Sequence, residues 1–130
     1  TLIYSMDKDK TKDINLIIKD NIGVTDIITN EVNNIDNDNY NINVKYSDLS
    51  VDAIKKEIVN KEDILIVINE SDTNYFDVDI ISYDNIDNYY NTLESILYNT
   101  KIKYALKTYN ISLEELENIE SNVSINRTIY

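Results

Sequence analysis

The sequence Ile64-Leu65-Ile66-Val67-Ile68 stands in the middle of the chain as five consecutive aliphatic residues, four of them β-branched. Charged residues 61–63 precede it and polar residues 69–72 follow it. Successive side chains of a strand point to opposite faces of its sheet, so a run that is apolar throughout must be covered on both faces. The stretch therefore predicts the central strand of a sheet with helices packed against it.

The segments on either side of this strand predict its neighbours. Residues 50–61 carry apolar side chains at helical spacing, with Ser50 as the N-cap, which indicates a helix packed on the sheet. Residues 42–46 alternate between apolar and polar, as an edge strand with one wet face does. Residues 76–80 alternate in the same way, which favours a hairpin with the central strand.

Helical spacing also recurs in two longer regions. Apolar residues between Ile14 and Ile35 fall mostly at steps of three and four, which predicts helix broken at Gly23, with Thr25 capping the second piece. The longest predicted helix runs from about Asp84 to Thr108. Ser112 and Glu115 form a capping box that begins one more short helix.

Both ends of the chain read as strands, residues 2–6 at the start and residues 123–129 at the end, and residues 33–41 read as a loop. The fold class predicted is α/β, a mixed sheet of about four to five strands with helices on both faces. Residues 1–130 are expected to form one domain, and their apolar, strand-like ends indicate a piece of a longer protein.

Composition excludes several classes of function. A formal charge of −12 and a single arginine argue against a nucleic-acid partner, because that affinity comes from basic side chains neutralising phosphates. The chain has no cysteine and no histidine, so it lacks the usual transition-metal ligands and the usual general base. One glycine cannot build a phosphate-binding loop. We therefore expect no cofactor, no metal and no catalytic residue.

Asp77 and Asp79 are the one arrangement that suits acid/base chemistry, because residues two apart on a strand point to the same face. A hydrolase using this pair would need a concave cleft above the strand. The alternative is a sheet face made soluble by acidic side chains, and we favour it, since no histidine, arginine or tryptophan is near in sequence.

Two further patterns suggest surface binding. Asp7 with Asp9, and Asp36 with Asp38, begin like calcium loops but lack the glycine and glutamate that complete them, so solvated turns are the alternative. The tyrosines of the last third could form a stacking surface for sugars or a peptide, or could simply be core. These tyrosines are Tyr83, Tyr89, Tyr90, Tyr98, Tyr104 and Tyr109.

Several segments, taken in order, resemble one family. Residues 3–11 give a strand and an Asp-rich turn, residues 50–68 give a lysine-rich helix that leads through Asp63 into the aliphatic strand, and residues 111–116 follow a long helix. This order is similar to the extracellular domain of type-2 ABC transporter permeases of the sodium-efflux NatB kind. The resemblance implies a domain inserted between two membrane helices.

The expected function is therefore a non-enzymatic extracellular domain of a bacterial ABC export permease, at the outer side of the cell membrane, with a role in gating, substrate capture or partner contact. The resemblance implies transmembrane helices in the same polypeptide, a separate cytoplasmic ATP-binding subunit, and an extracellular peptide or protein as a candidate ligand. It also predicts first and last strands adjacent in one sheet, with both ends leaving on the same side. The alternative is a stand-alone acidic interaction module, secreted or phage-encoded.

Overall fold

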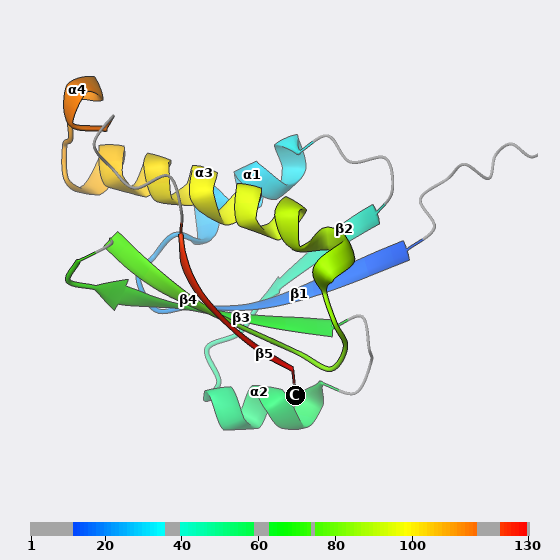
Figure 1. Ribbon diagram of the computed structural model, residues 1–130. Helices are drawn as coiled ribbons and strands as arrows, with labels where there is room; N and C mark the ends of the chain where they lie inside the picture. The colour runs from blue at the N-terminus through cyan, green and yellow to red at the C-terminus, as the bar shows by residue number, and fades with distance from the viewer. Residues whose placement is uncertain (1–11, 36–39, 59–62, 74, 117–122, 130) are drawn as a thin grey trace, which may run out of the picture.

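The computed structural model of the chain contains one five-stranded sheet with helices on both faces (Figure 1). The structure describes residues 12–35, 40–58, 63–73, 75–116 and 123–129. The strands are β1 (Lys12–Asp20), β2 (Tyr40–Tyr46), β3 (Asp63–Ser71), β4 (Tyr75–Ser82) and β5 (Ser124–Ile129). The helices are α1 (Thr25–Asn34), α2 (Val51–Glu57), the 3-10 helix η2 (Asp87–Tyr89), α3 (Tyr90–Thr108) and α4 (Leu113–Leu116).

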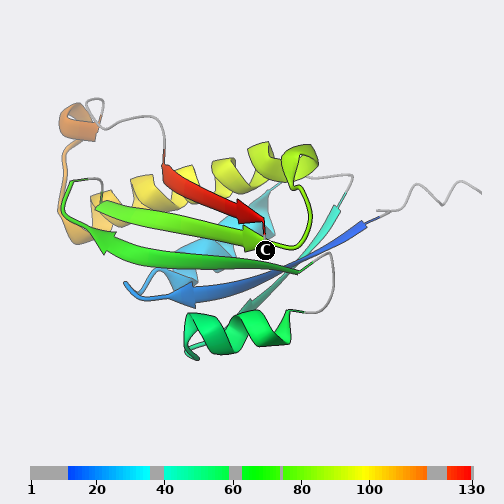
Figure 2. The ribbon, with the colours of Figure 1, turned by 60° about the horizontal axis from the view of Figure 1, so that its bottom comes forward.

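The sheet is mixed, with strand order β2-β1-β3-β4-β5. Strands β1, β2 and β3 are parallel, β4 is antiparallel to β3, and β5 is parallel to β4. Helices α1 and α3 cover one face, and α2 lies alone on the other (Figures 1 and 2). The predicted α/β class, with a mixed sheet and helices on both faces, is confirmed.

Strand β3 occupies the centre of the sheet, as its composition predicts. Its residues Ile64 to Ile68 are at most 4% exposed, because both faces are covered. Ile64, Ile66 and Ile68 belong to the main core beneath α1 and α3. Leu65 and Val67 face α2, where they form a second, smaller core with Ile17, Ile54, Ile58 and Ile81. Each fully buried side chain of this kind contributes about 1.5–3 kcal/mol to stability.

The helix predicted to start at Ile14 is wrong, because residues 12–20 form strand β1. Ile14, Leu16 and Ile18 point into the main core and Ile17 into the smaller one, so this strand is also apolar on both faces. A short run of this kind fits helical and strand periods equally well. The second piece, α1, is confirmed, but Thr25 does not cap it, since the helix has no side-chain cap.

The other predicted elements match the structure with shifted ends. The 42–46 segment lies in the edge strand β2, and residues 76–80 lie in β4, which forms the predicted hairpin with β3. Ser50 caps α2 by accepting a hydrogen bond from the Ala53 N–H, but α2 ends at Glu57 and not at residue 61. The long helix is a single unit that begins at Tyr90, after η2. Of the predicted loop at residues 33–41, residues 33–34 end α1 and residues 40–41 begin β2, while residues 36–39 lie outside the described ranges.

The start of β1, the first described strand, and the end of β5, the last one, lie at the same end of the sheet. The predicted strand at residues 2–6 lies outside the described residues. The predicted adjacency of that strand to the last one therefore stays a prediction. Among the described strands, β3 and β4 lie between β1 and β5. Strands β1 and β5 are antiparallel to each other, so β1 begins and β5 ends on the same side (Figure 2).

Candidate functional site

Asp77 and Asp79 lie on the same face of β4, as predicted, and both are partly exposed. Asp79 accepts a hydrogen bond from the side chain of Asn126 on β5 at 3.2 Å. This is the face that α2 covers only in part, since Ile81 of the same strand belongs to the small core beneath α2. The pair therefore sits on an open sheet face, where carboxylates keep a surface soluble.

The other acidic candidates fall outside what can be placed. Asp7, Asp9, Asp36 and Asp38 all lie outside the described residues. Within the described ranges, no group of three or more acidic, histidine or cysteine side chains is arranged to hold a metal ion. The calcium loops therefore stay a prediction.

The tyrosines divide between core and surface. Tyr89 and Tyr104 are 7% and 8% exposed and belong to the main core. Tyr83 packs against the smaller core, and Tyr98 packs against the main one. Tyr90 faces the guanidinium of Arg127, whose carbon lies 4.5 Å from the ring centre. Among the six predicted tyrosines, Tyr109 is the most open, at 47% exposure.

Four rings gather where the β3–β4 hairpin meets the end of α3, and we name Tyr75, Phe76, Tyr104 and Tyr109 the aromatic tip. Tyr109 lies edge-on to Tyr75, with ring centres 5.2 Å apart, and edge-on to Tyr104 at 5.8 Å. The rings of Phe76 and Tyr104 are 5.9 Å apart. The tip thus runs from a fully buried ring, Phe76, to the half-exposed ring of Tyr109.

The same end of the molecule carries the carboxyl ends of the parallel strands, where α/β sheets commonly bind ligands. A hollow of about 340 Å³ opens there, lined by Ile18, Asp20, Thr25, Tyr46, Ser47 and Asp48. Asp20, the last residue of β1, accepts hydrogen bonds from the N–H groups of Ile22 and Gly23, at 3.0 and 2.8 Å. It also accepts one from the Thr25 hydroxyl at 2.7 Å. Gly23 has φ of +89°, a conformation that favours glycine.

The environment shifts the pKa of two groups in this hollow. Burial alone would raise the pKa of Asp20, but the hydrogen bonds from Thr25 and the turn N–H groups outweigh it and hold the pKa below its usual value. Burial raises the pKa of Tyr46, and the charges of Asp20 and Asp26 add to the rise, against a hydrogen bond with Thr29. The Tyr46 hydroxyl also donates to the Thr25 carbonyl at 3.0 Å. At neutral pH the hollow therefore holds an ionised carboxylate beside a neutral phenol.

Strands β1 and β3 are neighbours at the point where the crossover direction changes, and polar contacts continue their pairing beyond the end of β1. The Asn21 N–H donates to the Ile68 carbonyl at 3.0 Å, and the Asn21 side chain donates to Asn69 at 2.7 Å. In the hollow, the Thr25 hydroxyl donates a hydrogen bond to the Asp20 carboxylate, so both side chains have their partners within the turn between β1 and α1. These hydrogen bonds therefore stabilise the loop between β1 and α1. Of the hollow and the aromatic tip, the aromatic tip is the more open surface.

Comparison with protein-family models, with curated proteins and with solved structures finds no match to this chain. Of the helices in the described ranges, none combines the length and the apolar character needed to cross a membrane.

Two parts of this end were not predicted. Tyr75 joins the tip, although it lies apart in sequence from the tyrosines of α3, because the hairpin places the start of β4 beside Tyr109. Asp20, two residues before Ile22 and three before the only glycine, has the spacing of an aspartate that binds the N–H groups of a turn. This spacing is visible in the sequence, but it is overlooked when residues 14–22 are predicted to be helical.

Proposed function

We propose that this chain is the extracytoplasmic domain of an ABC-type export permease and has no enzymatic activity of its own. In this proposal it is inserted between two membrane helices of the same polypeptide, on the outer side of the cell membrane. A separate cytoplasmic subunit binds and hydrolyses ATP. The domain contributes to gating, substrate capture or contact with a partner.

The observation that carries the proposal is the shared end of β1 and β5. Following the registers across the sheet, Ile129 at the end of β5 lies level with Leu16, the middle residue of β1. The two strands are three spacings apart, about 14 Å at about 4.8 Å per strand. The start of β1 at Lys12 lies four residues beyond this level, about 13 Å further along the strand. Neighbouring helices pack about 8–10 Å apart, so a linker of several residues is needed to join each strand end to a helix pair.

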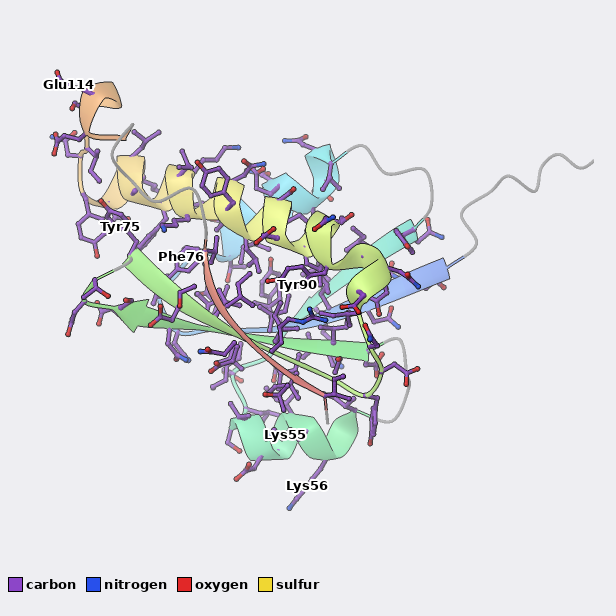
Figure 3. All side chains as sticks on the ribbon, in the orientation of Figure 1. Lys55, Lys56, Tyr75, Phe76, Tyr90 and Glu114 are labelled. Carbon is purple, nitrogen blue, oxygen red and sulfur yellow. The ribbon has the colours of Figure 1, made fainter. Side chains whose placement is uncertain are left out.

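Labelling of introduced cysteines tests the membrane placement, because the chain has no cysteine of its own. Asp72→Cys, in the β3–β4 turn, and Lys56→Cys, on α2, replace exposed residues (Lys56 is marked in Figure 3). The whole gene product, expressed in bacterial cells, is treated with a membrane-impermeant maleimide. We expect both positions to react in intact cells.

The matched control is Ala105→Cys, at a position that is 0% exposed, which should react only after the protein is unfolded. Reaction of Asp72→Cys and Lys56→Cys only after the cells are permeabilised would place the domain in the cytoplasm and overturn the proposal. Recovery of the whole gene product in the soluble fraction would overturn it too, in favour of the second candidate.

The second candidate is a stand-alone acidic interaction module. It is favoured by the net charge of −12 together with the exposed ring of Tyr109. It needs no membrane helices, so the cell fractionation just described separates it from the permease domain.

A further inference from the structure

The aromatic tip presents apolar surface to solvent. Tyr109 is 47% exposed and Leu106, one helical turn before it, is 36% exposed, so the two lie on the same side of the α3 end. Tyr75, which is partly exposed, extends this surface onto the hairpin. The other large exposed apolar residues belong to other elements: Leu49 lies in the β2–α2 loop, three strands across the sheet from β4, and Ile129 ends β5.

Backbone strain is concentrated at the same place. Within the described residues, the positive φ angles outside glycine belong to Tyr75, at 66°, and Asn110, at 52°. Asparagine tolerates this conformation, whereas a bulky ring such as that of Tyr75 does so only where its surroundings hold it. The contact with Tyr109 provides that hold. Strained residues of this kind gather at binding surfaces.

Negative charge surrounds the tip. Glu70 and Asp72, at the end of β3 and in the following turn, are exposed. Burial raises the pKa of Tyr104, as do its hydrogen bond with Tyr109 and the charges of Glu70 and Asp20, so this negative field reaches the rings. Two α3 lysines are exposed near its end: Lys107, in the last turn, and Lys103, which is paired with Glu31. Because Lys103 is neutralised by Glu31, Glu70 and Asp72 are opposed here by Lys107.

The chain already shows how such a surface holds a cation. The guanidinium of Arg127 lies over the ring of Tyr90 and also contacts the carboxylate of Asp87, at 2.9 Å. A ring face and a carboxylate together thus fix one arginine, the chain's only one. The aromatic tip offers rings beside Glu70 and Asp72, which is the same chemistry turned toward solvent.

We propose that the aromatic tip binds a basic peptide segment of a partner protein. Arginine or lysine side chains of the partner pack on the rings of Tyr75 and Tyr109 and approach Glu70 and Asp72, while its apolar side chains cover Leu106. Figure 3 shows Tyr75 at the hairpin end of the molecule, away from the end of β5. The inference rests on the proposed function only for orientation, since a domain held at β1 and β5 points this end away from the membrane.

A fluorescence titration of the chain in solution tests the surface. The probe is a synthetic peptide of alternating arginine and leucine that carries one tryptophan. The protein has no tryptophan, so emission from the peptide reports binding alone. We expect a saturable blue shift, about tenfold weaker binding by the Tyr109→Ala/Leu106→Ala variant, and unchanged binding by the Leu49→Ala control. Glu70→Gln/Asp72→Asn should weaken binding and reduce its dependence on salt.

Each alternative result overturns the inference. These results are no shift with the native protein, equal affinity of the tip variant and the Leu49→Ala control, equal binding of the same peptide with glutamate for arginine, and self-association through the tip in sedimentation. Circular dichroism and urea unfolding check that the variants are folded. Because the titration uses no membrane, its failure leaves the cysteine-labelling result untouched, and the two proposals fail separately.

Discussion

At the residue scale, the loop between β1 and α1 depends on Asp20. Its carboxylate accepts three hydrogen bonds, from the N–H groups of Ile22 and Gly23 and from the Thr25 hydroxyl. Asp20→Ala leaves these donors without their partner, and we expect a loss of about 1–2 kcal/mol in the free energy of unfolding, measured in urea. Asp26→Ala, an exposed acid in the first turn of α1, is the matched control and should change stability by less than about 0.5 kcal/mol.

The same residue gives a pH dependence with a defined sign. The pKa of Asp20 is lowered in the folded protein, so folding favours the ionised form. Its contribution is present above the unfolded-state pKa, near the usual 3.8, and is lost as the pH falls through the lower folded-state value. The stability difference between the native protein and Asp20→Asn should therefore be constant near neutral pH and shrink in acid. A difference that grows as the pH falls would contradict this assignment.

The role of Thr25 shows why residue roles are harder to read than elements. Its position at the start of α1 suggests a cap, but its hydroxyl donates to Asp20. The Thr25 hydroxyl donates to Asp20 because β1 ends at Asp20, whereas the sequence pattern predicts a helix at that position. A cap prediction is only as good as the element assigned on each side of it.

At the element scale, α2 is a seven-residue helix and, of the described helices, the one that packs on this face of the sheet, which it covers in part. Ile54 buries completely in the smaller core, and Ser50 fixes the helix start by accepting from Ala53. We expect Ser50→Ala to lower the free energy of unfolding by about 1 kcal/mol. Ser112→Ala removes a similar cap from the four-residue α4 and should have a smaller effect. Equal losses in urea unfolding would show that α2 docking does not depend on its cap.

Strands with strong patterns were predictable, and β1 was not. The five aliphatic residues of β3, four of them β-branched, favour a buried strand, and the alternation in β2 and β4 indicates an edge strand and a hairpin. In β1, Ile14, Ile17 and Ile18 match a helical stripe, while Ile14, Leu16 and Ile18 match a strand face. Only the pairing of β1 with β2 and β3 decides between these periods.

At the scale of the whole molecule, sheet order predicts a gradient of protection. Among the described strands, β1, β3 and β4 are paired on both sides, whereas β2 and β5 are each paired on one side. We expect amide hydrogen exchange to be slowest in β3 and its neighbours and faster in β5, whose side chains are mostly exposed. The measurement is native-state exchange followed by mass spectrometry or NMR. Equal protection of β5 and β3 would mean that β5 has a partner along its other edge.

The candidate surface also belongs to this scale, which is why the sequence indicated it only in part. The tyrosines of α3 were visible as a cluster, but which of them are core follows from how α3 packs on the sheet. Tyr75 and Tyr109 meet because one hairpin and one helix end at the same side of the molecule. The predicted pair Asp77 and Asp79 was placed correctly on one face of β4, where both side chains are partly exposed.

The shared side of β1 and β5 makes this fold portable. A host protein can receive it within a single surface loop, because β1 begins and β5 ends at the same end of the sheet, which leaves the opposite end of the sheet unobstructed. Inserted in this way into a stable carrier protein, the domain would expose its aromatic tip to solvent on the side away from the carrier. The same property lets such a module be exchanged between hosts as an intact cassette.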